Sequence, residues 1–178
     1  MNAETAPTNP IVTFETALGR CAVAWSDEGI TRVLLPGERT PRDPRVEDRA
    51  DVPALVRDAI AGMIAVLDGR PDDLRRIALD EHRLDPFRRA VYAATRAIDP
   101  GSTASYGEIA RMIGRPDTAR DVGVALARNP CPIIVPCHRV VSANGALTGF
   151  SAPGGIETKR RMLQIEGAPG FGQLALFG

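Results

Sequence analysis

The sequence predicts an α+β protein made of a small antiparallel β domain with one helix, followed by a mostly helical domain. Short β-branched runs separated by glycine turns occupy residues 11–36, a pattern typical of strands. Apolar residues recur at helical spacing in the second half of the chain, which indicates amphipathic helices. Charge also differs between the halves: counting Lys and Arg against Asp and Glu, residues 1–83 carry 11 − 15 = −4 and residues 84–178 carry 11 − 7 = +4.

Residues 1–83 are expected to form the N-terminal domain. Turns at Gly19-Arg20 and Glu28-Gly29 separate its first strand candidates, which predicts an antiparallel meander. A charged, proline-containing loop comes next, followed by an amphipathic helix and one further strand candidate. In order, we expect strands at 11–18, 20–26 and 30–36, a loop at 37–51, a helix at 53–69 and a strand at 76–84.

Residues 84–167 are expected to form the second domain, with 168–178 as a tail. Its first helix has Asp85 as the expected N-cap and a proline at the first helical position, where the missing N–H is not needed. Ser105 and Glu108 have capping-box spacing at the start of the next helix, and Asp117 is the expected N-cap of the third. The predicted helices cover 85–98, 105–114, 117–129 and 155–167.

The second and third of these helices are joined by a tight turn at Gly114. This arrangement is typical of a helix-turn-helix DNA-binding motif, although two packed helices of any α domain give the same pattern. Arg120 favours the DNA-binding interpretation, because it stands in the first turn of its helix, where the helix dipole makes a cation unfavourable. The net positive charge of the second half points the same way.

Composition argues against several classes of protein. Of the 178 residues 44% are apolar, but no stretch approaches the roughly 20 apolar residues that span a bilayer. The first ten residues lack the segments of a secretory signal, so we expect a cytoplasmic protein without disulfides, in which at least one of the three cysteines is a free thiol. Cysteine and histidine spacing fits no metal site, and no glycine-rich nucleotide loop is present. We therefore expect neither a metal nor a cofactor.

A thiol, an imidazole and a guanidinium stand side by side at Cys137, His138 and Arg139, between two apolar runs. A cysteine acts as a nucleophile in its thiolate form. The neighbouring histidine could serve as its base, and Glu166 is a candidate to orient that histidine. The alternative is an inert buried thiol after a strand, beside a hydrogen-bonded core histidine.

The motif PCHRV, preceded by Asn129-Pro130 and an apolar run, resembles the active-site signature of the methylated-DNA–protein-cysteine methyltransferases, the O6-alkylguanine-DNA alkyltransferases. The resemblance covers about residues 85–167, and the N-terminal part is only compatible with the small variable β domain of that family. It is carried by SYGEIARMIGRPDTARDVGVALARNPCPIIVPCHRVVSANGALTGF (105–150) and GGIETKRRMLQIEG (154–167).

This resemblance implies a DNA repair enzyme that acts once. The alkyl group of O6-alkylguanine, and also of O4-alkylthymine, would be transferred to a cysteine of the protein itself. The implied partner is double-stranded DNA containing O6-alkylguanine, bound through the minor groove, with the damaged nucleotide flipped out of the stack. No cofactor is implied. We expect a monomer and no membrane partner.

The resemblance also implies catalytic roles, position by position. Cys137 would be the alkyl acceptor, and His138 the base that deprotonates it through a water. Glu166 aligns with the glutamate that orients this histidine. Tyr106 matches the tyrosine that donates a proton to the guanine ring and so makes guanine a better leaving group.

A second set of matched residues is implied in binding DNA or the damaged base. Arg120 matches the arginine that enters the base stack and fills the space of the flipped nucleotide. Asn129 matches the asparagine that orders the turn between the recognition helix and the active-site strand. Contacts to DNA or the base are also expected from Ser151, Phe150 and Arg139.

Two departures from the family pattern concern the substrate loop. Phe150 stands where many members have tyrosine, and the loop FSAPGG (150–155) is longer than the aromatic-Ser-Gly-Gly form. Both leave the preferred adduct open. Three other functions remain as alternatives: a non-catalytic sensor of alkylation damage, a helix-turn-helix regulator without chemistry, and a cysteine hydrolase that uses Cys137, His138 and Glu166.

Overall fold

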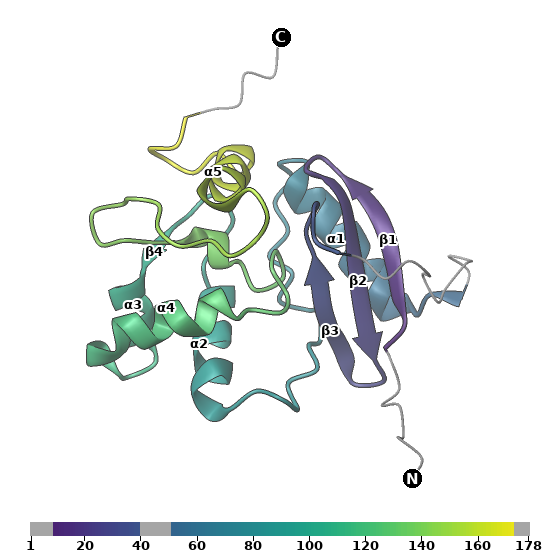
Figure 1. Cartoon of the computed structure of the whole chain (residues 1–178), viewed down its shortest axis with the longest axis horizontal. Coiled ribbons are helices and arrows are strands. Elements are labelled where there is room, and N and C mark those ends of the chain that lie inside the picture. Colours follow the sequence, from purple (N-terminus) through teal and green to yellow (C-terminus); the bar gives the residue numbers. More distant parts are fainter. Residues whose placement is uncertain (1–8, 40–50, 173–178) are drawn as a thin grey trace.

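The computed structural model describes residues 9–39 and 51–172 (Figure 1). A three-stranded antiparallel sheet opens the fold, with its strands in the order β1-β2-β3. The strands are β1 (Ile11–Thr16), β2 (Gly19–Ser26) and β3 (Gly29–Leu34). Turns at 17–18 and 27–28 join the strands, one or two residues before the expected positions, because Gly19 and Gly29 already begin β2 and β3. The expected antiparallel meander is confirmed. The loop predicted at 37–51 lies mostly outside the described residues.

Helix α1 (Ala54–Leu67) packs on one face of this sheet (Figure 1). Successive residues of a strand point to opposite faces, so Phe14 and Val23 share the core with Val56 and Met63 of the helix. Each fully buried apolar side chain of this kind stabilises the fold by roughly 1.5–3 kcal/mol. The other face of the sheet carries a smaller buried cluster, formed by Ile11, Ala22, Ala24 and Leu34.

The strand expected at 76–84 is wrong. This segment makes a single parallel bridge, between Ile30 and Leu79. Beyond the bridge the chain turns away, because the Asp80 carboxylate accepts hydrogen bonds from Ser26 Oγ (2.7 Å) and from the backbone N–H of His82 (3.1 Å). Such local side-chain bonds compete with a sheet ladder.

The second half of the chain begins with α2 (Pro86–Arg96), α3 (Tyr106–Met112) and α4 (Ala119–Ala127). Asp85 caps α2 as predicted, accepting from Arg88 N at 2.9 Å. The capping box of α3 is also present, with both of its hydrogen bonds. Together with the sheet, these helices confirm the α+β class.

The expected N-cap of the third helix is wrong. Asp117 lies inside a short 3₁₀ turn, η2 (Pro116–Thr118), and α4 begins after it without a side-chain cap. The proline at the start of η2 sets a helical φ one turn early, which moves the cap position past Asp117. Helices α3 and α4 still pack on one another, an arrangement compatible with a helix-turn-helix.

The active-site region contains no long strand. Residues 131–136 form turns, Cys137–Arg139 form a 3₁₀ turn (η3), and only β5 (Val140–Val141) pairs, in parallel with β4 (Ala104–Ser105). The active-site strand expected from the resemblance is therefore wrong at this position. Prolines 130, 132 and 136 lack the N–H that a ladder requires. Helix α5 (Gly155–Ile165) closes the fold.

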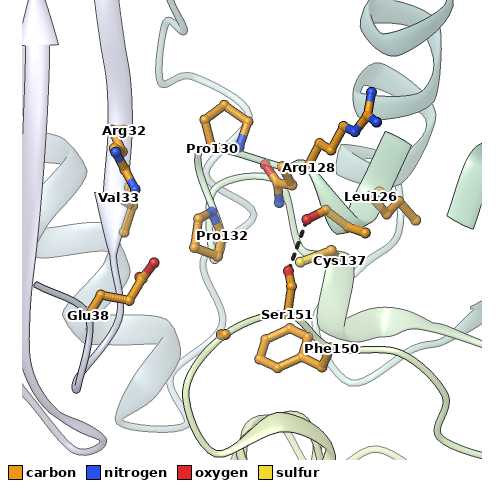
Figure 2. A pocket seen from close by; sticks show the side chains of 13 residues that line it. Arg32, Val33, Glu38, Leu126, Arg128, Pro130, Pro132, Cys137, Phe150 and Ser151 are labelled. Atoms are coloured by element: carbon orange, nitrogen blue, oxygen red, sulfur yellow. Dashed lines mark hydrogen bonds between the residues drawn. The ribbon is translucent and has the colours of Figure 1, made fainter. Parts of the chain in front are cut away.

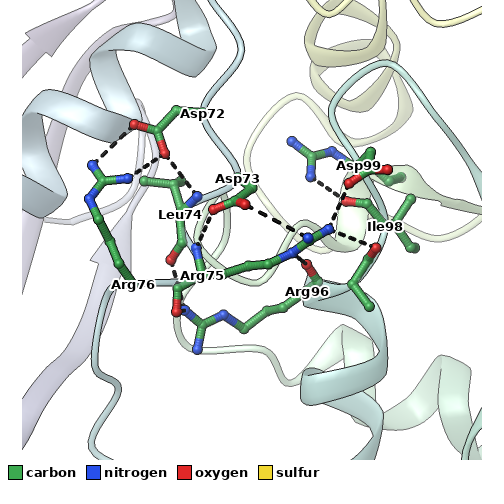
Figure 3. Close-up of polar contacts among 10 residues, drawn as sticks. Asp72, Asp73, Leu74, Arg75, Arg76, Arg96, Ile98 and Asp99 are labelled. Carbon is green, nitrogen blue, oxygen red and sulfur yellow. Dashed lines mark hydrogen bonds and ion pairs between the residues drawn. The ribbon is translucent and has the colours of Figure 1, made fainter.

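Two arginines connect the segment after α1 to the end of α2 (Figure 3). Arg96 donates to the carbonyl oxygens of Leu74 and Ile77, both at 2.8 Å. Arg75 donates to Asp99 at 2.7 Å. One hydrophobic core also runs through both halves of the molecule. No helix within 9–39 or 51–172 has the length and apolar character needed to cross a membrane.

Candidate active site

Cys137 lies partly exposed at a cavity of about 360 Å³ between the two halves of the molecule (Figure 2). The sulfur belongs to the first residue of η3, directly after the proline-rich turns. The end of α4, the turns and the loop after Phe150 form one side of the cavity, and β3 with its following turn forms the other. Its lining residues are Arg32, Val33, Glu38, Leu126, Ala127, Arg128, Asn129, Pro130, Pro132, Cys137, Phe150, Ser151 and Ala152.

Asn129 holds the turn that leads to this cysteine. Its Nδ2 donates to Val135 O at 2.9 Å, and its Oδ1 accepts from Cys131 N at 3.0 Å. The structure thus places Asn129 where the resemblance implies a turn-ordering residue. Burial raises the pKa of the Cys137 thiol, while the Asn129 side chain and the charge of Lys159 oppose that rise. The resting sulfur is therefore a thiol that needs a base.

His138, Arg139 and Glu166 form a buried network behind the cysteine. His138 Nε2 lies 2.8 Å from Glu166 Oε1, and Arg139 Nη2 donates to the same oxygen at 2.7 Å. Gly101 N donates to the other carboxylate oxygen at 3.1 Å. Burial alone would raise the pKa of Glu166, but His138 and Arg139 hold it well below its usual range.

The expected DNA contact of Arg139 does not fit its position. The residue is 1% exposed. Its guanidinium donates hydrogen bonds to the Glu166 carboxylate and, through Nη1 at 2.8 Å, to Ile98 O. A guanidinium pairs with a carboxylate through two parallel bonds, and this geometry turns Arg139 inward. Arg139 therefore holds the Glu166 carboxylate in position and lies away from any surface that DNA could reach.

The network fixes the protonation of the histidine ring. An ionised carboxylate only accepts hydrogen bonds, so we assign the proton of the His138–Glu166 bond to Nε2. Burial lowers the pKa of His138, although Glu166 opposes this, and the ring is neutral at pH 7. Nδ1 then carries a lone pair, and this buried atom has no hydrogen-bond partner among the described residues. It is available to accept a proton.

Lys159 is a site residue that sequence reasoning missed. It is fully buried on α5, and its Nζ donates to Val140 O at 2.6 Å and to Thr148 O at 3.1 Å. Burial lowers the pKa of Lys159 to about 8, against an opposing effect of Cys137. One signal could have found it: in a chain whose basic residues are otherwise all arginine, Lys159 is the single lysine.

Tyr106 lies next to this lysine, at the start of α3. Its hydroxyl donates to Thr148 O at 3.2 Å, the same carbonyl that Lys159 uses, and Lys159 Nζ lies 5.9 Å from the centre of the ring. Burial raises the pKa of the phenol, while the bond to Thr148 opposes the rise. Tyr106 also lines a shallow hollow together with Arg120 and Gly123 of α4. Arg120 is exposed there, in the first turn of its helix.

The substrate loop brings the remaining candidates to the cavity. Phe150 and Ser151 both line it, and Ser151 Oγ donates to Ala127 O at 2.9 Å (Figure 2). The loop and α4 are thereby joined beside the sulfur. All nine candidate residues consequently lie at the cavity, at the neighbouring hollow or in the network behind them, but Arg139 lies in that network and not at a surface that could contact DNA.

The other two cysteines do not compete with Cys137 for this position. All three are free thiols, but Cys21 and Cys131 are buried. Burial raises the pKa of Cys131 to about 12, which suppresses its thiolate at neutral pH. Within the described ranges no cluster of three or more His, Cys, Asp or Glu side chains could hold a metal ion.

Known proteins resemble the chain in sequence and in fold. The family model described as "6-O-methylguanine DNA methyltransferase, DNA binding domain" matches residues 86–168. A methylated-DNA–protein-cysteine methyltransferase of Methanosarcina acetivorans is 49% identical, covering 87% of this chain and 96% of that protein. One from Haemophilus influenzae is 32% identical, covering 88% and 85%. The crystal structure of Mycobacterium tuberculosis OGT in complex with DNA has a TM-score of 0.72 at 33% identity, covering 90% and 96%.

Proposed function

This chain belongs to the methylated-DNA–protein-cysteine methyltransferase family, and we propose that Cys137 is the residue on which its chemistry takes place. The protein repairs DNA by transferring the alkyl group of O6-alkylguanine to a cysteine of its own. One observation carries the choice of Cys137: it is the only described cysteine that lines the cavity and is followed by a neutral buried histidine with a free ring nitrogen.

The first step is removal of the thiol proton. His138 Nδ1 takes it, through a water, and the ring becomes an imidazolium. Glu166, ionised and bonded to Nε2 at 2.8 Å, stabilises that positive charge and holds the ring in one orientation. Arg139 in turn fixes the carboxylate. The thiolate exists only while the base holds its proton, because burial disfavours the charged sulfur.

The thiolate then displaces guanine from the alkyl carbon. The sulfur–carbon bond forms as the carbon–O6 bond breaks, and the electron pair passes to the purine. Tyr106 gives its hydroxyl proton to the ring, which makes guanine a neutral leaving group. Lys159 remains bonded to Thr148 O when Tyr106 releases it, and its charge offsets the negative charge on the phenol oxygen.

The product explains why one molecule of protein repairs one lesion. The sulfur ends as a thioether, and a thioether has no acyl group that water could hydrolyse. Among the described residues that line the cavity, Cys137 is the only thiol. The same displacement at O4-alkylthymine requires no additional group, so we propose that lesion as a second substrate.

Access to the base requires the nucleotide to leave the duplex. The O6 carbon cannot reach a side chain inside the stack, and extrusion costs a few kcal/mol. Arg120 is exposed at the start of α4 beside Tyr106, and we propose that it fills the space that the base leaves. We propose that α4 lies in the minor groove and that the protein works as a monomer.

The test is intact-protein mass spectrometry after mixing with a duplex that carries one O6-methylguanine. We expect the protein to gain one methyl group, on the peptide that contains Cys137, and to stop at one per molecule. The peptides that contain Cys21 and Cys131 are internal controls. A methyl group on either of them would overturn the assignment, and continued consumption of substrate would refute the single-use mechanism.

A further inference from the structure

The N-terminal sheet supplies one wall of the cavity that holds Cys137. Arg32 and Val33 lie on β3, and Glu38 lies in the turn that follows it. Figure 2 shows Glu38 extending toward the cavity and Arg32 and Val33 beside it on β3, on the side opposite Cys137. Transfer of a methyl group, as described above, uses none of them. Their position therefore calls for another explanation.

This wall is held in place by two contacts to the active-site segments. Val33 N donates to Pro130 O at 2.9 Å, so the outer edge of β3 is hydrogen-bonded to the turn before the cysteine. Gly37 packs against Pro153 in the longer substrate loop, and a Cβ added to this glycine would lie 3.0 Å from the Pro153 Cβ. These two contacts join the wall to the chain segments before and after Cys137.

The wall carries a cation without a partner. Arg32 is exposed, and its side chain makes no hydrogen bond or ion pair within residues 9–39 and 51–172. The carboxylate of Glu38, on the same wall, already accepts a 2.6 Å hydrogen bond from Leu35 N. Arg32 is therefore the unpaired charge on this wall of the cavity.

We propose that Arg32 selects O6-alkylguanines whose alkyl chain ends in an anion, with O6-carboxymethylguanine as the representative substrate. The inference rests on the proposed role of Cys137. A cavity of about 360 Å³ lies in the size range of small-molecule sites, and its lining includes both Cys137 and Arg32. A guanidinium binds a carboxylate through paired hydrogen bonds.

The chemistry of the transfer is unchanged for this substrate. The thiolate attacks the CH₂ carbon, the carbon–O6 bond breaks, and guanine leaves with the proton from Tyr106. The cysteine becomes S-carboxymethylcysteine. What changes is the charge, because the carboxylate and the thiolate repel one another at short range. Arg32 offsets this repulsion from the far side of the cavity.

Single-turnover rates on three duplexes test the proposal. The lesions are O6-carboxymethylguanine, its neutral carbamoylmethyl counterpart, and O6-methylguanine as the reference for normalisation. Arg32→Ala is expected to lower the carboxymethyl-to-carbamoylmethyl rate ratio about threefold to fivefold, the effect of an exposed charge pair. Arg32→Lys keeps the charge and should keep most of the ratio. Arg20→Ala is the matched control and should leave the ratio unchanged, because it removes an exposed arginine of β2 that pairs with Glu15 of β1.

The outcomes separate this proposal from the function itself. An equal ratio in wild type and Arg32→Ala, with methyl transfer intact, overturns the role of Arg32 and leaves the repair function standing. A ratio that falls as much in Arg20→Ala also overturns it, because a general surface charge would then be responsible. Absence of transfer from all three lesions would instead remove the proposed function of Cys137.

Discussion

Two clusters of charged side chains in this molecule look alike in a contact diagram and differ in burial. Behind the active site, His138, Arg139 and Glu166 have side chains that are 1%, 2% and 3% exposed. Near α1, Arg76 bonds to Asp58 (2.8 Å) and to Asp72 (2.7 Å), and the three side chains are 46%, 47% and 19% exposed. Figure 3 shows the second cluster at the Arg76–Asp72 pair.

This difference in burial decides what each cluster of charges can do. Exposed charges are screened by water, so such pairs contribute little to stability. Buried charged groups cannot bond to water, so they depend on their protein partners for every hydrogen bond. Removal of one partner leaves the other charges uncompensated. Only the buried cluster can therefore hold the pKa of a histidine and its tautomer in a fixed state. This property is what a catalytic base requires.

Glu166→Gln is expected to have the largest effect. The substitution preserves shape but leaves the Arg139 guanidinium buried without its counter-charge, which costs about 3–5 kcal/mol. We also expect alkyl transfer to be lost, because nothing then stabilises the imidazolium of His138. Urea denaturation gives the stability, and a single-turnover assay gives the transfer rate.

A second substitution separates charge from structure in the same network. Arg139→Met combined with Glu166→Gln removes the uncompensated cation and should recover part of the lost stability without restoring transfer.

The pH dependence of the wild-type stability supplies a further check on the same network. Because the folded-state pKa of Glu166 is depressed, its contribution is present above the ordinary glutamate pKa and is lost as pH falls below it. Loss of less than about 1 kcal/mol in Glu166→Gln would contradict the importance of burial.

Lys159→Met is expected to act mainly on the rate. A buried ammonium stabilises negative charge on Cys137 and Tyr106, so its removal should slow transfer by about tenfold or more. In wild type we expect the rate to fall at alkaline pH, around or above the lysine pKa of about 8. Lys159→Met should lack this alkaline decline. Single-turnover rates across the pH range measure both effects.

The stability of the same variant has a predicted sign. The pKa of Lys159 is lowered from 10.5 to about 8 by burial, so the unfolded chain binds more protons between these two values. Wild-type stability should therefore rise with pH across that window, and Lys159→Met should lose the rise. Arg160→Met, an exposed neighbour on α5 near Glu157, is the matched control. Equal effects of both substitutions would show that burial of Lys159 is not the cause.

The parts of the fold that sequence predicted correctly depend on neighbouring residues. Asp85 and the Ser105–Glu108 pair are capping signals confined to one helical turn, and both are present in the structure. The strands of the meander depend on alternation and on two local turns. Asp117 failed for the same local reason, since η2 occupies the positions where the cap was expected.

The parts that sequence could not supply depend on contacts between distant residues. Arg139 turns inward because it donates hydrogen bonds to Glu166 and to Ile98 O, which are 27 and 41 positions away in the sequence. The role of Lys159 depends on two carbonyl groups from other segments. Cys137 was found by its neighbours in the motif, whereas the wall that faces it comes from β3, about a hundred residues earlier. No periodicity or spacing connects these segments.

Arg76→Ala is expected to have the smallest effect. It removes two ion pairs at once, yet each is partly exposed to water, so we expect a loss of under about 1 kcal/mol that shrinks further at high salt. Urea denaturation at low and high salt measures it, and alkyl transfer should remain at the wild-type rate. The two clusters contain a similar number of bonds, so bond counting predicts similar losses for Arg76→Ala and Glu166→Gln. If the measured losses of stability are similar, the number of partners and not burial determines the contribution of both clusters. The argument that burial keeps His138 neutral would then lose its physical basis.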